Sequence, residues 1–164
     1  MKQAMILAAG RGQRMQHLSV DTPKPLLQVK GRALIEYVLW GLQRAGIERV
    51  VINVHYHAEQ IMEFLGDGSA YQLEIQYSHE TEELLGTGGG IRRALPLLGE
   101  EPFICVSADI FTTFDFSQLP VLKSDQLAHL VLVNNPEYKH QGDFSLNDGC
   151  IGVDGFKLTY ANIS

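Results

Sequence analysis

The chain alternates short apolar runs with segments of helical periodicity, and this alternation limits its fold more than any other feature. Five runs rich in branched residues recur along the sequence: Ala4–Ala8, Arg49–Val54, Leu73–Tyr77, Phe103–Val106 and Leu130–Val133. Their short length and continuous apolar character are typical of strands that are buried on both faces of a mostly parallel sheet.

The segments between these runs carry the helical pattern. One apolar stripe at helical spacing consists of Leu34, Ile35, Val38, Leu39 and Leu42. Gly46 is placed to end that helix. Shorter helices are predicted over Ala58–Leu65 and over Gly90–Leu98, the second interrupted late by Pro96. Alternating strands and helices predict an α/β fold with a doubly wound, mostly parallel, Rossmann-like sheet.

The alternation fades after Asn134. Three short, partly exposed strands are predicted there, joined by turns at 147–149 and 154–155: Gly142–Ser145, Cys150–Val153 and Phe156–Tyr160. The sequence therefore predicts a small hairpin appendage beside the main sheet. We expect a single domain over residues 1–164, truncated at its C-terminus because the chain stops in what reads as another strand.

Composition excludes several classes of protein. Hydrophobic residues make up 45% of the chain and charged residues 20%, which is typical of a globular protein and not of a disordered one. The net charge is −6 without a basic block, so we expect no nucleic-acid partner. Cys105 and Cys150 form no disulfide framework and no apolar stretch approaches about 20 residues, so we expect a cytoplasmic protein that does not enter membranes.

Two glycines and two arginines follow the first predicted strand. Gly10 and Gly12 permit positive φ, so their backbone N–H groups can surround phosphate oxygens, and Arg11 and Arg14 add positive charge. Met15 stands where the dinucleotide fingerprint requires glycine, and the Lys-Ser/Thr pair of a Walker loop is missing. The loop predicts phosphate binding, and a glycine turn without a ligand is the alternative.

Two charged residues farther along suit the same chemistry. Lys24 lies between Pro23 and Pro25, which predicts an extended, stiff backbone that presents its ammonium group to an anion. Asp109 follows the run Phe103–Val106, at the carboxyl end of a strand, where a Mg²⁺ ion that bridges phosphates is held. Asp115 is the competing carboxylate, although its setting is more typical of a turn or a helix entry.

Several segments taken together form one long signature: Leu7–Met15, Thr22–Leu26, Gly31, Leu34–Ile35, Gly66–Ser69, Thr87–Ile91, Ala94–Gly99 and Gly142–Leu146. This signature resembles that of the sugar-1-phosphate nucleotidyltransferases. Within that superfamily it is most similar to the uridylyltransferases that act on N-acetylmuramate 1-phosphate, and next to the mannose-1-phosphate guanylyltransferases.

The resemblance implies transfer of a nucleotidyl group from UTP to N-acetylmuramate 1-phosphate, with Mg²⁺ as cofactor and pyrophosphate as product. Arg14, Lys24 and Asp109 would be catalytic, and Asp109 would also hold the metal. The implied nucleotide-binding residues are Ala8, Ala9, Gly10, Arg11, Gly12, Gly88 and Gly89. Asp143 and Asn162 would bind the sugar phosphate.

The chain also departs from the family pattern. Ala108 replaces the glycine that usually precedes the metal-binding aspartate, and the stretch Glu80–Gly86 differs, which leaves the choice of base open. Family members continue past this point with a second metal-binding aspartate. The alternatives are therefore a mannose-1-phosphate guanylyltransferase and a catalytically idle nucleotide-binding or interaction module. A sheet without its last pieces would self-associate through an exposed edge.

Overall fold

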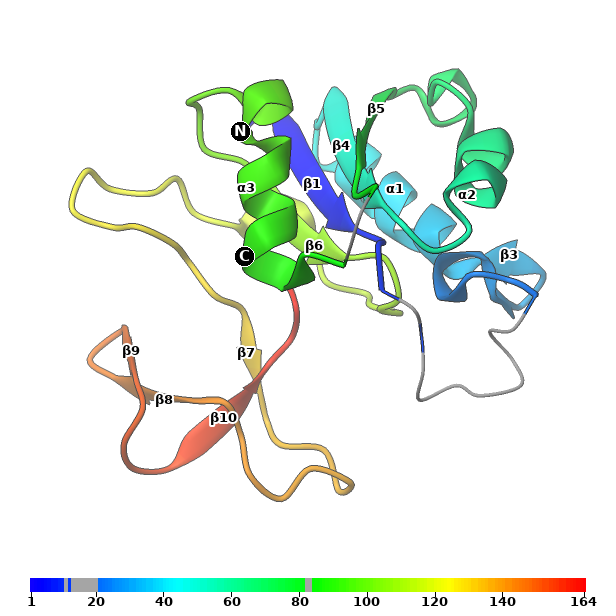
Figure 1. Cartoon of the computed structure of the whole chain (residues 1–164). Coiled ribbons are helices and arrows are strands. Elements are labelled where there is room, and N and C mark those ends of the chain that lie inside the picture. The colour runs from blue at the N-terminus through cyan, green and yellow to red at the C-terminus, as the bar shows by residue number, and fades with distance from the viewer. Residues whose placement is uncertain (11, 13–20, 82–83) are drawn as a thin grey trace. The chain divides into compact units, whose positions relative to one another are not determined.

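The computed structural model describes residues 1–10, 12, 21–81 and 84–164 (Figure 1). The described chain divides into two compact units, unit 1 over Met1–Val121 and unit 2 over Leu122–Ser164. The single domain expected over 1–164 stays a prediction. No helix among the described residues has the length and apolar character needed to cross a bilayer.

Unit 1 is built on a parallel sheet of four described strands in the order β5-β4-β1-β6. These strands are β1 (Gln3–Leu7), β4 (Arg49–Val54), β5 (Glu74–His79) and β6 (Ile104–Ser107). All three neighbouring pairs are parallel, and β1 lies between β4 and β6. The predicted parallel α/β sheet is confirmed, and four of the five predicted strand runs lie in it.

Three helices of the described chain cover this sheet: α1 (Leu34–Arg44), α2 (Ala58–Leu65) and α3 (Gly86–Leu98). The end of α1 confirms the predicted role of Gly46. With φ of +81°, Gly46 donates its N–H to the Gln43 carbonyl at 3.0 Å, and Ile47 donates to the Leu42 carbonyl at 3.1 Å. This pair of bonds is the Schellman pattern, in which glycine takes the left-handed conformation most easily.

The core lies against both faces of the sheet. Met5 and Val51 from neighbouring strands pack with Ala94 and Leu98 of α3, and all four are almost fully buried. Successive strand residues face opposite sides, so their neighbours along β1 and β4 face the other layer. The connections through α1 and α2 lead from β1 toward β5, whereas the connection through α3 leads back in the opposite direction, from β5 to β6. Because such connections are right-handed, α1 and α2 lie on one face of the sheet and α3 lies on the other. Figure 1 shows α3 standing alone in front of β1.

The start of α3 differs from the sequence prediction. The helix was predicted from Gly90, with a glycine loop before it, but it begins at Gly86 and continues past Pro96 to Leu98. Glycine disfavours helix, so local propensity places this start too late. The N-cap residue Leu85 donates its N–H to Glu80 Oε2 at 2.9 Å, a side-chain contact that helix propensity does not take into account.

Smaller elements complete unit 1. A hairpin that the sequence analysis missed joins β2 (Gln28–Val29) and β3 (Arg32–Ala33) through Lys30 and Gly31, both with positive φ. The remaining elements among the described residues of unit 1 are the 3₁₀ turns η2 (Lys24–Leu26), η3 (Ser69–Tyr71) and η4 (Phe116–Gln118). The extended backbone predicted at Lys24 is wrong, because that residue opens the turn η2.

Unit 2, all of whose residues are described, holds an antiparallel sheet in the order β7-β10-β8-β9. Its strands are β7 (Leu132–Val133), β8 (Phe144–Asn147), β9 (Cys150–Gly152) and β10 (Lys157–Tyr160). The predicted hairpin at residues 147–149 is confirmed as the β8–β9 connection, where Asp148 and Gly149 both have positive φ. The turn at 154–155 forms no second hairpin, because β10 pairs with β8 and β7 and not with β9.

The predicted strand Leu130–Val133 is the main error. Only Leu132 and Val133 form a strand, and they pair antiparallel with Tyr160 and Thr159 in unit 2 instead of joining the parallel sheet. Val133 is 45% exposed. The run has the apolar composition of a buried strand, but composition does not specify the partner strand, which here belongs to the antiparallel sheet.

Candidate active site

The candidate site lies at the carboxyl edge of the parallel sheet. The chain runs from β1 to β4 and β5 on one side and then returns to β6 on the other side, so the strand order reverses between β1 and β6. Open α/β sheets bind ligands beyond the carboxyl ends of their strands at such a reversal. Ala8 and Ala108 are the first residues beyond β1 and β6, and the Ala108 N–H donates to the Leu7 carbonyl at 3.0 Å.

Two predicted catalytic residues meet at this edge. The Lys24 ammonium lies 2.5 Å from Asp109 Oδ2, although 85 positions separate the two residues in the sequence. Their side chains are 29% and 36% exposed, so the ion pair is open to a ligand from solvent. Lys24 opens the 3₁₀ turn η2, at whose end the Leu27 N–H donates to the Lys24 carbonyl at 3.1 Å. The structure therefore places a cation and a carboxylate together beside the reversal.

The residues after β1 differ in whether their backbone is available to a ligand. Ala8 and Ala9 are buried, and the Ala8 N–H already donates to Asn53 Oδ1 at 2.8 Å. Gly10 is exposed and has open space where a Cβ would lie, and Gly12 has φ of +62°. The Ala8 amide thus anchors the loop within the protein, while the backbone at Gly10 is accessible. Arg11 and Arg14 lie outside the described residues.

Gly88 and Gly89 belong to the start of α3. The predicted loop under the nucleotide is therefore wrong as a loop, since both glycines are helical. The amides of Gly86, Thr87 and Gly88 lie in the first turn, where backbone N–H groups lack intrahelical acceptors and the helix dipole favours anions. Their predicted role in nucleotide binding stays a prediction, now attached to a helix N-terminus.

Two buried polar residues that the sequence analysis missed connect these segments. Asn53 in β4 and Glu80 just after β5 are each 3% exposed. Asn53 Nδ2 donates to Glu80 Oε1 at 2.7 Å, and the Leu85 N–H donates to Glu80 Oε2 at 2.9 Å. An asparagine within the apolar run Arg49–Val54 was the one available signal in the sequence.

Asp109 is the one carboxylate that the described residues of the candidate site offer to a metal ion. No group of three or more His, Cys, Asp or Glu side chains could hold a metal ion within the described ranges. Mg²⁺ commonly takes one or two carboxylates and completes its shell with phosphates and water, so Asp109 fits such an ion together with a nucleotide. Asp115 instead caps η4: it accepts from the Ser117 hydroxyl and N–H, and these bonds lower its pKa.

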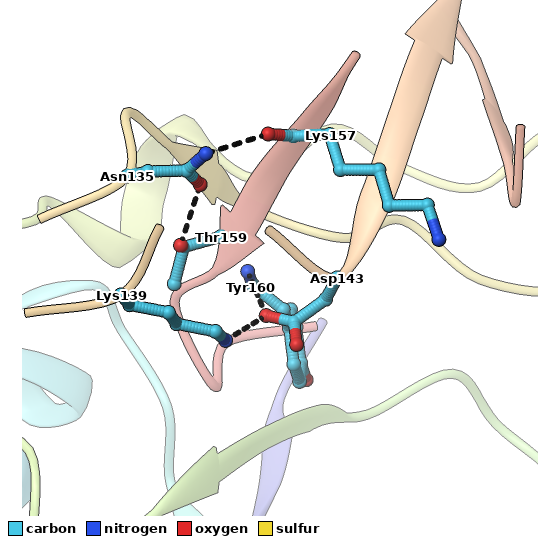
Figure 2. Close-up of polar contacts among 6 residues, drawn as sticks. All are labelled: Asn135, Lys139, Asp143, Lys157, Thr159 and Tyr160. Atoms are coloured by element: carbon cyan, nitrogen blue, oxygen red, sulfur yellow. Dashed lines mark hydrogen bonds and ion pairs between the residues drawn. The ribbon is translucent and has the colours of Figure 1, made fainter. Parts of the chain in front are cut away.

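The two predicted sugar-phosphate residues lie in unit 2. Asp143 Oδ2 accepts from Lys139 Nζ at 2.5 Å and from the Tyr160 N–H at 2.9 Å (Figure 2). The Lys139 bond, followed by the Tyr160 bond, lowers the pKa of Asp143. Asn162 follows β10, is exposed and has φ of +59°. Both predicted roles stay predictions.

Comparison with known families identifies the chain. The family model described as nucleotidyl transferase matches residues 3–144. The chain belongs to the nucleotidyl transferase family. That match includes Lys24 and Asp109, as well as the link through Asn53 and Glu80.

Relatives of this nucleotidyl transferase chain include two groups named for sugar 1-phosphates. It is 51% identical over 150 residues to an N-acetylmuramate alpha-1-phosphate uridylyltransferase of Neisseria meningitidis, a match that covers 87% of this chain and 64% of that protein. It is 33% identical over 137 residues to a mannose-1-phosphate guanylyltransferase of Mycobacterium tuberculosis, covering 81% and 38% of the two chains. The chain thus spans less than two thirds of the length of either relative.

A solved structure supports the fold of this nucleotidyl transferase. HddC from Yersinia pseudotuberculosis, crystallised with GMP-PN, superposes with a TM-score of 0.76 over 99% of this chain and 73% of its own. The identity is 22%, so the likeness concerns the fold alone.

Proposed function

We propose that the protein transfers a nucleotidyl group from a nucleoside triphosphate, UTP first, to a sugar 1-phosphate, N-acetylmuramate 1-phosphate first. The contact between Lys24 and Asp109 at the strand reversal carries the proposal. The 51% identity to an N-acetylmuramate alpha-1-phosphate uridylyltransferase supports this choice of substrates. The mannose-1-phosphate guanylyltransferase reaction is the second candidate, because a relative of that name covers most of the chain.

The reaction joins two anions. A phosphate oxygen of the sugar 1-phosphate attacks the α-phosphorus of the triphosphate, the bond from that phosphorus to the β-phosphate oxygen breaks, and pyrophosphate leaves. Cations and backbone N–H groups that hold both reactants in line lower the barrier by positioning and by stabilising negative charge.

Each residue of the candidate site has a role in this scheme. Lys24 would bind phosphate oxygens at the reacting centre, and Asp109 would hold Mg²⁺, which supplies positive charge to the phosphates when bound. The loop 8–12 would surround the triphosphate, with Arg14 close to the departing pyrophosphate. Gly88 and Gly89 would face the nucleotide, while Asp143 and Asn162 would bind the sugar phosphate.

Three further properties belong to the same proposal. A cytoplasmic location is supported by the free thiols of Cys105 and Cys150. The net charge of −6 favours small anionic substrates held at local cationic sites over a nucleic-acid partner. Self-association through an exposed sheet edge stays a prediction, and sedimentation over a range of concentrations would test it.

Nucleotide binding by calorimetry tests the proposal. Lys24→Ala should weaken Mg-UTP binding by about 1.5–3 kcal/mol, the range for hydrogen bonds to charged groups. Lys2→Ala, which removes an exposed lysine paired with Glu48, is the matched control and should bind as the wild type does. Tighter binding of Mg-GTP than of Mg-UTP would favour the guanylyltransferase. Absence of binding by the wild type to either nucleotide would favour the interaction module, and nucleotide binding without pyrophosphate exchange would favour the idle nucleotide-binding module.

The metal assignment has a separate test. Asp109→Asn keeps the size of the side chain but removes the charge that a hard cation requires, so the Mg²⁺ dependence of UTP binding should disappear. Asp115→Asn is the matched control, because that carboxylate caps η4 and should not affect the metal titration. Identical Mg²⁺ titrations for wild type and Asp109→Asn would contradict the assignment.

A further inference from the structure

A buried polar link joins the two glycine-bearing segments of the proposed nucleotide site. It runs from the Ala8 N–H through the side chains of Asn53 and Glu80 to the Leu85 N–H, with bonds of 2.8, 2.7 and 2.9 Å. We infer that Asn53 and Glu80 are positioning residues for nucleotide binding, which rests on the proposed function. They act through the backbone at the ends of the link and touch no reacting atom.

The ends of the link lie directly beside the predicted nucleotide-binding residues. Ala8 precedes Ala9 and Gly10, whose backbone leads into the phosphate loop. Leu85 is the N-cap of α3, one residue before the first-turn amides that start at Gly86. By fixing both amides to one pair of side chains, the protein fixes the spacing of two sets of backbone donors. A phosphate chain held by both sets would depend on that spacing.

The chemistry of the pair determines its orientation. A carboxylate only accepts hydrogen bonds, so Glu80 can bind both Asn53 Nδ2 and the Leu85 N–H, one on each oxygen. The Asn53 amide must therefore turn its nitrogen toward Glu80 and its oxygen toward the Ala8 N–H. Each group in the link faces the only partner type that satisfies it, and at 3% exposure neither side chain can use bulk water instead.

The surroundings are built to accommodate this pair. A Cβ atom at Gly90 of α3 would lie 2.6 Å from Asn53 Nδ2 and 2.7 Å from Glu80 Oε1, so only glycine leaves room for the link. The Glu80 backbone is held as well: its N–H donates to the Val54 carbonyl at 2.9 Å, and its carbonyl accepts from His55 Nδ1 at 2.5 Å. The third glycine of the Gly88–Gly90 tract is thus explained by packing against the link.

Exchanging the two functional groups tests the inference. In Glu80→Gln a donor NH₂ group faces either Asn53 Nδ2 or the Leu85 N–H, and in Asn53→Asp two carboxylates face each other. In the double variant Asn53→Asp/Glu80→Gln, the aspartate accepts from the Ala8 N–H and from the glutamine NH₂, and the glutamine oxygen accepts from the Leu85 N–H. Every hydrogen bond is then restored at the same total charge.

Mg-UTP binding is measured for the full chain at a temperature where each variant is folded. We expect each single variant to weaken binding by about tenfold or more, the effect of an unsatisfied buried polar group, and the double variant to bind within about threefold of the wild type. The control Ile61→Val shortens a fully buried side chain of α2 and should bind as the wild type does.

The outcomes separate the inference from the proposed function. A wild type that binds neither UTP nor GTP would overturn both. A wild type that binds UTP, with single variants that bind equally well, would overturn the inference alone. The same holds if the double variant fails to recover binding, or if Ile61→Val loses binding in proportion to its loss of thermal stability, because the link would then act only through general stability.

Discussion

The two sheets of this protein bury their strands to very different degrees. In unit 1, residues 4–6 of β1 and 50–52 of β4 are fully buried, because helices cover both faces of a parallel sheet. In unit 2, Ser145 is the buried strand residue, while Leu146 and Ile151 are 51% and 47% exposed. Strands of the first kind are specified by their own apolar sequence, whereas strands of the second kind depend on turns, cross-strand pairs and side-chain bonds.

Bonds from side chains to the backbone replace part of the core in unit 2. Asn135 Nδ2 donates to the Lys157 carbonyl at 2.8 Å, and the Thr159 hydroxyl donates to Asn135 Oδ1 at the same distance (Figure 2). Asp143 likewise binds the Tyr160 N–H. These bonds hold β10 in place where few apolar side chains are buried.

Truncating one apolar strand residue in each sheet should give the largest contrast. Met5→Ala removes a fully buried side chain that packs against Val51 and Leu98, and should cost about 2–5 kcal/mol of unfolding free energy. Ile151→Ala, at a cross-strand pair with Leu146, should cost less than about 1 kcal/mol. Chemical denaturation, monitored by hydrogen exchange in each unit, measures the loss of unfolding free energy for both variants. Equal losses of unfolding free energy in the two variants would contradict the proposed difference between the two sheets.

A smaller loss of stability is expected at Gly142, which packs tightly against β10 in unit 2. A Cβ atom at Gly142 would lie 2.4 Å from the Lys157 carbonyl oxygen and 2.6 Å from the Leu158 carbonyl carbon, both of them backbone atoms of β10. Gly142→Ala should therefore destabilise unit 2 by about 1–3 kcal/mol, since the backbone must shift. Gly149→Asn is the control, because that position has open space and a left-handed φ that asparagine tolerates.

The smallest effect concerns pH. The bonds from Lys139 and Tyr160 lower the pKa of Asp143 in the folded protein. The stability that this carboxylate contributes is therefore present above its unfolded pKa of about 3.9 and is lost as the pH falls through its lower folded pKa. Asp143→Asn should remove that acid dependence and cost less than about 1 kcal/mol at pH 7, the range of partly exposed ion pairs. NMR titration of Asp143 with unfolding curves from pH 2 to 7 measures both. An unchanged acid dependence in Asp143→Asn would contradict the assignment.

The difference between the sheets also explains which parts of the fold could be read from the sequence. The predicted ranges of β4 and α2 match the structure residue for residue, because each has a complete apolar pattern and a clear end. The prediction failed for Leu130–Val133, where the partner strand β10 lies more than 20 residues farther along the chain, and for the start of α3, where the N-cap Leu85 bonds to the Glu80 side chain. Apolar composition does not specify which sheet a short run joins.

The candidate site shows the same division. Lys24 and Asp109 could be selected from their local settings, and the structure brings them into contact. Asn53 and Glu80 could not be selected in the same way, because their hydrogen bond joins positions 27 apart and their importance depends on which amides they reach. Residues that present charge to a ligand can be recognised from their local sequence. Residues that orient other residues can be recognised only from the three-dimensional structure.

The position of β1 in the sheet also has a consequence for folding kinetics. Among the described strands β1 comes first in the chain and lies inside the sheet, and its neighbour β6 pairs Ile104 with Ala4 from nearly the opposite end of unit 1. Such long-range pairing requires the chain to close a large loop, and the entropy lost in closing it is offset only after the strands are in contact. This order of events slows folding. Asp109 follows β6, so the native contact between Lys24 and Asp109 depends on β6 lying beside β1, and its appearance during refolding is expected to report the completed parallel sheet.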